Sequence, residues 1–448
     1  MSGPAPARLA AWRALVRVSA GAVRLDDSHA ALPELEGLAD NDRRLATELV
    51  TGTVKRRLSI DAVLSSFAAS PLARVRADVL EALRLSAYQL LFLDRVPAHA
   101  AVDDGVELVA RRGKRTRGFV NAVLRGVARE GRGRFETLAG RDDVDGRAVR
   151  WSCPPWLVEL LERDLGGAAA AQLLAAANDP PERCLRVNTL RGDVATAAVS
   201  LEAAGFSVAG VPALPEALRY EGPPLEASRP FRDGLVTAQS RGSQLAGLVA
   251  ARGVTEPRAI LDLCAAPGTK TSQLAAAYPG VRLVACDADA QRLDVLRANL
   301  RRLDVRGVDV VHADATSLPD TFTGVFDLVL VDAPCSGFGT LGTRPDARWR
   351  RRPADIERLA AAQHRLLAGA ARCVRAGGAL TYAVCTVTAA ETLGVVDELV
   401  RSGPWELDDL GTLVPDAAHP ANGAFLRTLP PAWGSTAFFV ARLRRPVG

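Results

Sequence analysis

The stretch Phe326–Gly339, FDLVLVDAPCSGFG, limits what this chain can fold into more than any other. Its first six residues are apolar except for one Asp, and turn residues follow soon after them. Such a run is typical of a buried strand in a parallel sheet, where helices cover both faces. Asp332 and Cys335 then lie at the carboxyl end of the strand, where open α/β sheets gather ligands and catalytic groups. The stretch predicts an α/β sheet with an acid and a thiol at one edge.

The rest of the C-terminal half agrees with this prediction, because apolar runs alternate with helical patterns from about Pro257 onward. Strands are expected at 259–264, 281–286, 308–313, 326–331, 378–385, 425–428 and 436–443. Helices are expected from about 271, and at 290–303, 354–374 and 389–401. Repeated strand–helix units of this kind predict a doubly wound, mostly parallel sheet.

The N-terminal part has a different pattern, since residues 6–135 show apolar positions at helical spacing and no convincing strand. Asn41 or Asp42 is expected to cap one helix, and Pro97 to precede another. The Gly-, Arg- and Asp-rich stretch Gly131–Gly146 is predicted to be a linker. Between 155 and 251, helices alternate with short strands, which predicts a small α/β unit.

Length and composition narrow the possibilities further. A chain of 448 residues suggests two or three domains. No apolar run is long enough for a membrane span, and the N-terminus lacks a signal-peptide cleavage pattern. Seven scattered cysteines without a CxxC pair indicate a reducing cytoplasm, and argue against a disulfide framework or a structural zinc. Five scattered histidines give a metal site little support.

The net charge of +5 allows an anionic partner without requiring one. Basic residues bunch in one helical region and are candidate phosphate ligands. They are Arg111, Arg112, Lys114, Arg115, Arg117 and Arg125. The alternative is a solvated helical face with no ligand.

The first strand–helix loop of the C-terminal half is rich in small residues, which let the backbone approach a ligand closely. It comprises Cys264, Ala265, Ala266, Pro267, Gly268, Thr269 and Lys270. It matches neither GxGxxG nor the P-loop pattern, which weakens a nicotinamide reading and excludes a nucleoside-triphosphate loop. Asp287, Asp314 and Asp332 end three further strands, and acids there bind ribose hydroxyls or a base amine. The combination favours S-adenosylmethionine.

Cys335 and Cys385 end neighbouring strands in the expected order, whereas Cys264, Cys286 and Cys373 are interpreted as structural thiols. A reactive thiol needs a lowered pKa, for which Lys270 and Arg344 are candidate basic neighbours. A thiolate, an acid and a methyl donor together suit methylation of cytosine at C5. Addition of the thiolate to C6 makes C5 nucleophilic, and the base must be unstacked to react.

Several segments resemble the RNA 5-methylcytosine methyltransferases: CAAPGTKT, DAPCSG, the RPD of residues 344–346, and TYAVCTVTAAET. The N-terminal segments DRRLATELVTGTVKRR and GFVNAVLRGVAR are similar to NusB-like RNA-binding domains. LRVNTLRGD and VTAQSRGSQLA are similar to the elements that join the two domains. The combination resembles the RsmB (Sun/Fmu) family, which methylates a cytosine of the 16S ribosomal RNA.

The resemblance implies three domains: an all-α NusB-like domain at 1–138, a linker and small α/β domain at 139–255, and a Rossmann-like methyltransferase domain at 256–448. It implies S-adenosylmethionine bound by the small-residue loop with Asp287, Asp314 and Asp332. The expected partner is 16S RNA, free or in a partly assembled small subunit, bound by a cytoplasmic monomer without a metal.

The resemblance also assigns catalytic roles. Cys385 is the implied nucleophile, Cys335 helps to release the product, Asp332 contacts the cytosine, and Lys270 orders the site. Thr269 stands where a second Gly is common, and Val384 where Thr is usual. Ala390, Glu391 and Thr392 stand, close to Cys385, where Glu-Glu-Asn is typical.

Three alternatives stay open. Cys335 is the nucleophile if the chain follows the DNA cytosine-C5 methyltransferases, in which the Pro-Cys motif supplies it. The substrate is transfer RNA or another RNA in a second alternative. In the third, the chain is a non-catalytic RNA-binding or antitermination factor.

Overall fold

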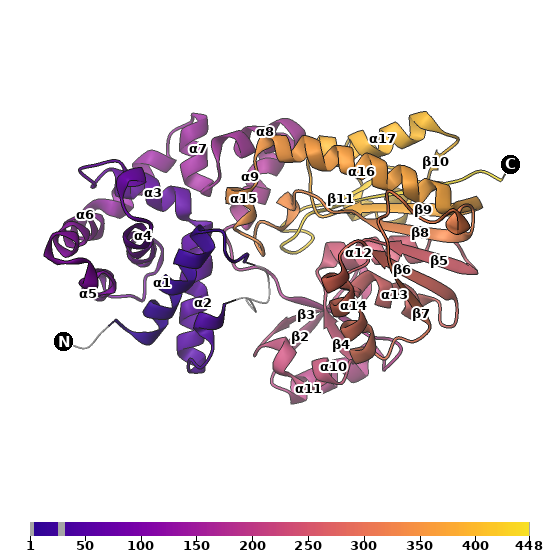
Figure 1. The fold of residues 1–448 in the computed structure, drawn as a ribbon, viewed down its shortest axis with the longest axis horizontal. Helices are drawn as coiled ribbons and strands as arrows, with labels where there is room; N and C mark the ends of the chain where they lie inside the picture. Colours follow the sequence, from indigo (N-terminus) through magenta and orange to yellow (C-terminus); the bar gives the residue numbers. More distant parts are fainter. Residues whose placement is uncertain (1–3, 26–31, 448) are drawn as a thin grey trace. The chain divides into compact units, whose positions relative to one another are not determined.

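The computed structural model describes residues 4–25 and 32–447 of the chain (Figure 1). Contacts within the chain divide it into two compact units. The first unit holds the residues up to Pro180 together with Leu341–Arg351, and the second holds Pro181–Thr340 and the residues from Arg352 on. None of the helices in the described part is long and apolar enough to span a membrane.

The first unit is helical, as its sequence pattern predicts. Its centre is α4, whose side chains are buried on nearly all sides by α1, α2, α3, α5 and α6. The helices are α1 (Pro6–Ser19), α2 (Asp40–Lys55), α3 (Arg57–Ser65), α4 (Ala77–Phe92), α5 (Ala98–Leu108), α6 (Lys114–Ala139), α7 (Val144–Trp151), α8 (Pro155–Leu165), α9 (Gly167–Ala176) and α15 (Ala347–Arg350), with short turns η1 (Pro33–Leu35), η2 (Leu72–Arg74) and η3 (Ala110–Arg112).

Two local predictions in this unit are wrong. The expected linker Gly131–Gly146 is mostly helical, because α6 continues to Ala139 and α7 begins at Val144. Gly131 is buried in α6 close to Leu91, so its missing side chain allows helix packing rather than a flexible turn. The helix α2 begins at Asp40 after Ala39, so neither Asn41 nor Asp42 caps it.

The segment Leu341–Arg351 belongs to the first unit although the chain on both sides belongs to the second. Arg348 in α15 is fully buried and donates hydrogen bonds of 3.0–3.4 Å to six oxygen atoms. The acceptors are the carbonyls of Lys55, Trp151, Ser152, Ala177 and Leu341 and the side chain of Asn178. Trp349 donates to the carbonyl of Val54 and packs on the helical core.

The second unit contains two sheets. The small sheet is antiparallel, with the strand order β2-β3-β1-β4. Its elements are β1 (Cys184–Val187), α10 (Val194–Ala203), β2 (Ser207–Val211), β3 (Leu214–Glu221), η4 (Leu225–Ala227), α11 (Arg229–Arg232) and β4 (Val236–Ala238). The helix α12 (Arg241–Ala251) packs against strand β3 of this sheet and against strands β8, β9 and β12 of the other.

The large sheet has the order β10-β12-β9-β8-β5-β6-β7, with β11 paired to β12. Strands β5 to β9 run parallel, and β12 is antiparallel to β9. The elements are β5 (Ala259–Leu263), α13 (Thr269–Ala277), β6 (Arg282–Asp287), α14 (Ala290–Arg302), β7 (Val308–His312), η5 (Asp320–Phe322), β8 (Phe326–Asp332), η6 (Phe338–Thr340), α16 (Pro353–Cys373), β9 (Val374–Val384), η7 (Ala389–Glu391), α17 (Leu393–Ser402), β10 (Glu406–Leu407), α18 (Leu410–Leu413), η8 (Pro415–Ala417), β11 (Leu426–Thr428) and β12 (Phe438–Arg444).

Helices cover both faces of the large sheet, with α16 on one face and α12, α13 and α14 on the other (Figure 1). This arrangement explains why Phe326–Val331 of strand β8 are all buried. The one polar residue among them, Asp327, accepts hydrogen bonds from the backbone of Arg258 and Ala259 and pairs with Arg375. The predicted mostly parallel, doubly wound sheet is therefore confirmed.

The strand order also fixes the position of a crevice. From β5 the chain adds β6 and β7 on one side, and then returns to add β8 and β9 on the other. The direction of winding thus reverses between β5 and β8, and ligands bind beyond the carboxyl ends of strands at such a point.

Candidate functional site

The loop after β5 brings its backbone close to this crevice. Cys264 has a positive φ of 60° and Gly268 a φ of 97°, which turn the chain sharply before α13 begins. A side chain at Gly268 would be strained in this conformation, and its Cβ would lie 3.3 Å from Leu296. Asp287 accepts a hydrogen bond of 3.2 Å from the backbone N–H of Ala266, which holds the loop to the end of β6.

Three acids stand at or just after the carboxyl ends of β6, β7 and β8, and the first two, Asp287 and Asp314, lie in different settings. Asp287 is 4% exposed, while Asp314 is exposed and accepts two hydrogen bonds of 2.8 Å from Thr316 in its own turn. These hydrogen bonds lower the pKa of Asp314, the backbone N–H of Thr316 contributing most. Each carboxylate has about four acceptor positions, so both acids still have capacity for a ligand hydroxyl or amine. The small-residue loop and these acids fit a nucleoside-containing methyl donor.

Lys270 and Asp332 meet at the reversal point between β5 and β8. Lys270 Nζ donates to Asp332 Oδ2 at 2.7 Å and to Ser243 Oγ at 2.9 Å. The ammonium group also lies 5.5 Å from the centre of the Phe438 ring. The side chain of Lys270 is 6% exposed and that of Asp332 is 32% exposed, so the acid is the member of the pair that a substrate can reach.

Cys335 and Cys385 lie side by side, with their Sγ atoms 3.3 Å apart. The pairing of β8 with β9 explains this, because Asp332 is opposite Ala383 at the ends of the two strands. Both cysteines are half-buried. The expectation that these residues end neighbouring strands is confirmed.

The expectation that a basic neighbour lowers the pKa of a reactive thiol is wrong for Cys335. Its hydrogen bond with Cys385, its burial, and the negative charges of Cys385 and Glu391 raise the pKa of Cys335 well above its usual value. Lys270 is paired with Asp332, and Arg344 belongs to the first unit. Cys335 therefore stays protonated and can donate its S–H to the sulfur of Cys385.

A buried carboxylate, Glu391, holds the two cysteine loops together. Its Oε1 accepts from the backbone N–H of Ser336 at 2.8 Å and from Gln363 at 3.1 Å. Its Oε2 accepts from Thr388 at 2.8 Å and from Thr386 at 3.4 Å. Glu391 is therefore placed to position the loops that carry Cys335 and Cys385, although its neighbours Ala390 and Thr392 differ from the residues typical of the family. The sequence signal was an acid six residues after Cys385, among threonines that supply hydroxyl donors.

Glu391→Ala is expected to loosen the loop that carries Cys335. Loss of the carboxylate leaves the N–H of Ser336 without its acceptor, which costs about 3 kcal/mol for a buried charged hydrogen-bond network. Amide hydrogen exchange at Ser336 should then be about a hundredfold faster. Glu398→Ala, which removes an exposed acid from α17, should leave this exchange rate unchanged. Equal rates in both variants would contradict the role given to Glu391.

Asp262 in β5 lies beneath the loop and is fully buried. Thr271 donates to its Oδ2 at 2.6 Å, while its Oδ1 has no hydrogen-bond partner among the described residues. Burial raises the pKa of Asp262 to about 7, against an opposing contribution from the Thr271 hydrogen bond. The folded chain therefore holds a proton here between about pH 4 and pH 7 that the unfolded chain releases.

The pKa of Asp262 is higher in the folded chain than in the unfolded chain. Its proton therefore stabilises the folded state fully below the ordinary pKa of an Asp, and this stabilisation is lost as the pH rises through about 7. Asp262→Asn removes this dependence. The variant should gain about 3 kcal/mol in unfolding free energy relative to the wild type between pH 5 and pH 8. Denaturant titrations at both pH values measure the difference. Asp309→Asn, at an exposed position of β7, should show no such gain. A pH-independent difference for Asp262→Asn would contradict the assignment.

The basic residues singled out in the sequence belong to the first unit, on η3 and α6. Arg111, Lys114, Arg115 and Arg125 are exposed. Arg112 forms an ion pair of 2.6 Å with Asp78. Lys114 and Arg117 also line a shallow hollow of about 530 Å³, together with Val106, Ala110, Gly118 and Asn121. Among the residues that the structure describes, no group of His, Cys, Asp and Glu side chains is arranged to hold a metal ion.

Comparisons with family models match three regions of the chain. Residues 5–129 match the NusB family, and residues 153–225 match a ferredoxin-like domain of RsmF/B-like methyltransferases. Residues 252–444 match the 16S rRNA methyltransferase RsmB/F model.

Whole-length similarities agree with these matches. The chain is 32% identical to a probable ribosomal RNA small subunit methyltransferase B of Bacillus subtilis, over 91% of this chain and 92% of that protein. It is 36% identical to a putative methyltransferase of Mycobacterium tuberculosis (Rv1407), over 98% and 96%. The crystal structure of PH0851 matches with a TM-score of 0.81 and 25% identity, over 99% of this chain and all of that one. The NusB-like, ferredoxin-like and Rossmann-like parts thus follow one another in a single polypeptide, and the chain belongs to the RsmB/F family of small-subunit ribosomal RNA methyltransferases.

Proposed function

We propose that this chain transfers a methyl group from S-adenosylmethionine to C5 of a cytosine in 16S ribosomal RNA through a covalent bond between Cys385 and C6. The observation that carries the proposal is the pair of thiols, Cys335 and Cys385, at the ends of adjacent strands. The ion pair of Lys270 and Asp332 lies at the next strand junction of the same sheet.

The pKa of Cys335 supports Cys385 as the nucleophile. Because Cys335 keeps its proton, it can donate to Cys385 and stabilise the negative sulfur there. A thiolate is the reactive form of a cysteine, and an adjacent hydrogen-bond donor favours that form. Cys385 then attacks C6, the C5=C6 electron pair moves toward N3, and N3 takes a proton from the pair of Lys270 and Asp332.

When bound, S-adenosylmethionine supplies an electrophilic methyl group to the activated C5. The loop Cys264–Thr269 and the acids Asp287 and Asp314 are proposed to hold it. Product release requires loss of the C5 proton and cleavage of the bond between C6 and sulfur, which restores the C5=C6 double bond. The C5 proton passes to water, N3 returns its proton to the pair of Lys270 and Asp332, and the sulfur of Cys385 leaves C6 as a thiolate. Cys335 is placed to assist this release, because its protonated thiol lies 3.3 Å from that sulfur and can donate a hydrogen bond to it.

The substrate assignment rests on the relatives, whose names specify the small-subunit ribosomal RNA. The exposed basic residues of η3 and α6 are proposed to contact phosphates of that RNA. Ribosomal RNA as substrate implies a cytoplasmic protein. Neutralising the basic cluster would weaken binding uniformly across RNA sequences, since phosphate contacts carry no base information.

The experiment offers the purified chain and labelled S-adenosylmethionine three substrates: 16S RNA, small subunits lacking methylation, and transfer RNA. Bisulfite sequencing then locates any 5-methylcytosine. One modified cytosine in either ribosomal substrate supports the proposal. Modification of transfer RNA alone overturns the substrate. No transfer, together with no binding of S-adenosylmethionine by calorimetry, overturns the enzyme assignment in favour of an RNA-binding factor.

A further inference from the structure

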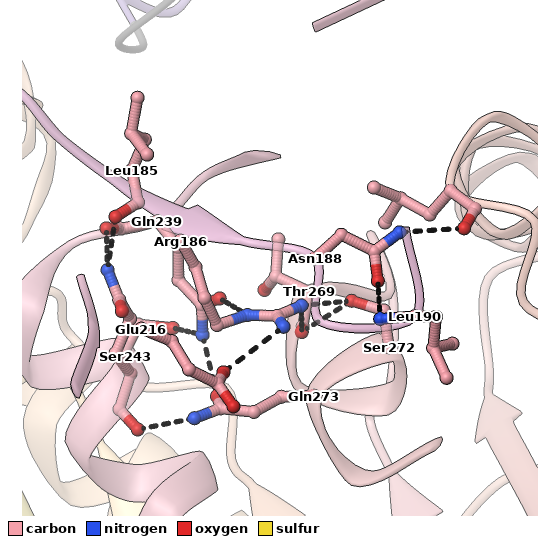
Figure 2. A network of polar contacts seen from close by, with 12 residues as sticks. Leu185, Arg186, Asn188, Leu190, Glu216, Gln239, Ser243, Thr269, Ser272 and Gln273 are labelled. Atoms are coloured by element: carbon pink, nitrogen blue, oxygen red, sulfur yellow. Dashed lines mark hydrogen bonds and ion pairs between the residues drawn. The ribbon is translucent and has the colours of Figure 1, made fainter. Parts of the chain in front are cut away.

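Arg186 in β1 of the small sheet is a fully buried cation whose side chain points toward the loop of the large sheet (Figure 2). Its Nη2 donates to Ser272 Oγ at 2.7 Å and approaches the carbonyl oxygen of Thr269 at 3.5 Å, both in the first turns of α13. Its ion-pair partner, Glu216, is 3.5 Å away and 32% exposed. Removing a cation from water costs free energy, which an ion pair of 3.5 Å with a partly exposed acid offsets only in part. An apolar side chain could join the two sheets without this desolvation cost. This cost favours a role beyond packing.

A continuous set of hydrogen bonds leads from Arg186 to Lys270. Arg186 Nε donates to Gln239 Oε1 at 2.8 Å, so the amide nitrogen of Gln239 must face the opposite way. That nitrogen donates to Ser243 Oγ at 3.3 Å and to Gln273 Oε1 at 3.1 Å. Ser243 Oγ in turn accepts the hydrogen bond of Lys270. The guanidinium therefore sets the orientation of each group up to the ammonium.

The helices that carry these groups have little room to shift. At Gly247 of α12, an added Cβ would lie 2.0 Å from the side-chain oxygen of Gln273 in α13. Gln273 also donates to the carbonyl of Gln244, at 3.0 Å. Lys270 itself has a long flexible stem, so two fixed acceptors, Ser243 and Asp332, are needed to hold its ammonium in one place.

We propose that Arg186 is a positioning residue for methyl transfer, which acts through Gln239 and Ser243 to hold Lys270 in line with Asp332. This inference rests on the proposed function, since it assigns a purpose to the position of Lys270. It makes the small sheet part of the catalytic apparatus in addition to any contact it makes with RNA.

The first test uses the full-length chain with Ser243→Ala, which removes one of the two acceptors of Lys270. The value of kcat should fall about 10- to 100-fold, as is usual when a group that orients a reactive residue is lost. The Kd for S-adenosylmethionine should not change. Ser228→Ala is the matched control, because Ser228 also caps a helix of the second unit, α11, and its hydroxyl bonds Leu225 and Phe231 rather than Ser243 or Lys270. It should lower the melting temperature without slowing the reaction. A control that slows the reaction as much as Ser243→Ala would overturn the proposal.

The second test separates the two contacts of Arg186. Arg186→Met should slow the reaction as Ser243→Ala does, and Arg186→Lys, which keeps a donor for Gln239, should restore much of the rate. Ser272→Ala removes the shorter of the two contacts between Arg186 and α13, leaves the path through Gln239 intact, and should leave kcat near the wild-type value. If Ser272→Ala reproduces the loss and Arg186→Lys does not rescue it, Arg186 only fastens the two sheets and the proposal is wrong.

A third measurement does not depend on activity. The chain has only three lysines, Lys55, Lys114 and Lys270. Acetylation by an N-hydroxysuccinimide ester, followed by mass spectrometry, reports Lys270 relative to the exposed Lys114. Lys270 should react faster in Arg186→Met and Ser243→Ala, but not in Ser228→Ala. If the wild type methylates no RNA while these labelling changes occur, the proposed function fails and the positioning stands. Unchanged labelling overturns the positioning itself.

Discussion

Cys385→Ala should abolish methylation, with a loss of at least about ten thousandfold in kcat, as expected when a nucleophile is removed. No covalent complex with RNA should form. The reason is the arrangement of the two thiols, whose Sγ atoms lie 3.3 Å apart, together with the raised pKa of Cys335. Denaturing gel electrophoresis with RNA that contains 5-fluorocytidine detects the adduct, and radiolabelled methyl transfer measures the rate.

Cys335→Ala should give the opposite pattern, in which a covalent RNA–protein complex accumulates because the release step is slow. Cys373→Ala is the control, since this buried thiol donates only to a backbone carbonyl, that of Gly369, in its own helix. It should cost some stability and leave turnover intact. An adduct in Cys385→Ala that is missing in Cys335→Ala would exchange the two roles, as in the alternative based on the Pro-Cys motif.

Arg348→Met should destabilise the first unit by about 3–5 kcal/mol, the usual cost of removing one partner from a buried charged network. The guanidinium is fully buried, and burial lowers the pKa of Arg348 to about 10. Its loss leaves six oxygen atoms from four parts of the unit without their common donor. Chemical denaturation followed by the fluorescence of tryptophans in this unit, such as Trp349 and Trp151, measures the effect.

Arg344→Ala in the same segment is the matched control for this prediction. Its side chain is exposed, so the change in unfolding free energy should stay within about 0.5 kcal/mol. A small effect for Arg348→Met would mean that water replaces the guanidinium among the carbonyl oxygens, and that the segment is held mainly by Trp349.

Local patterns were sufficient to predict that Lys270 and Asp332 lie at one edge of the large sheet. A buried apolar run ends at Asp332, and a second apolar run followed by small residues precedes Lys270. Each pattern predicts a strand followed by a turn, so both side chains were expected at the carboxyl edge of the sheet. The adjacency of Cys335 and Cys385 followed from the expected strand order, which the pairing of β8 with β9 confirms.

The remaining features depend on contacts between residues far apart in the chain. Arg186 lies 86 residues from its partner Ser272, and its neighbours in sequence give no sign of a buried network. Gly131 resembled a linker residue because composition cannot show that Leu91 packs against it. The start of α2 at Asp40 was missed because its preceding residue, Ala39, offers no side-chain acceptor.

The excursion Leu341–Arg351 has a consequence for how this protein can be divided. The chain crosses between its two units at three peptide bonds, after Pro180, Thr340 and Arg351. A fragment that begins at Pro181 would still carry those eleven residues, but Arg348 and Trp349 would lack the groups of the first unit to which they donate hydrogen bonds. Such a fragment should be prone to aggregation until a short glycine-rich loop replaces the excursion. A recombination event that exchanges only one of the two units would also separate these eleven residues from the helices they pack against. The two units are therefore expected to be inherited together.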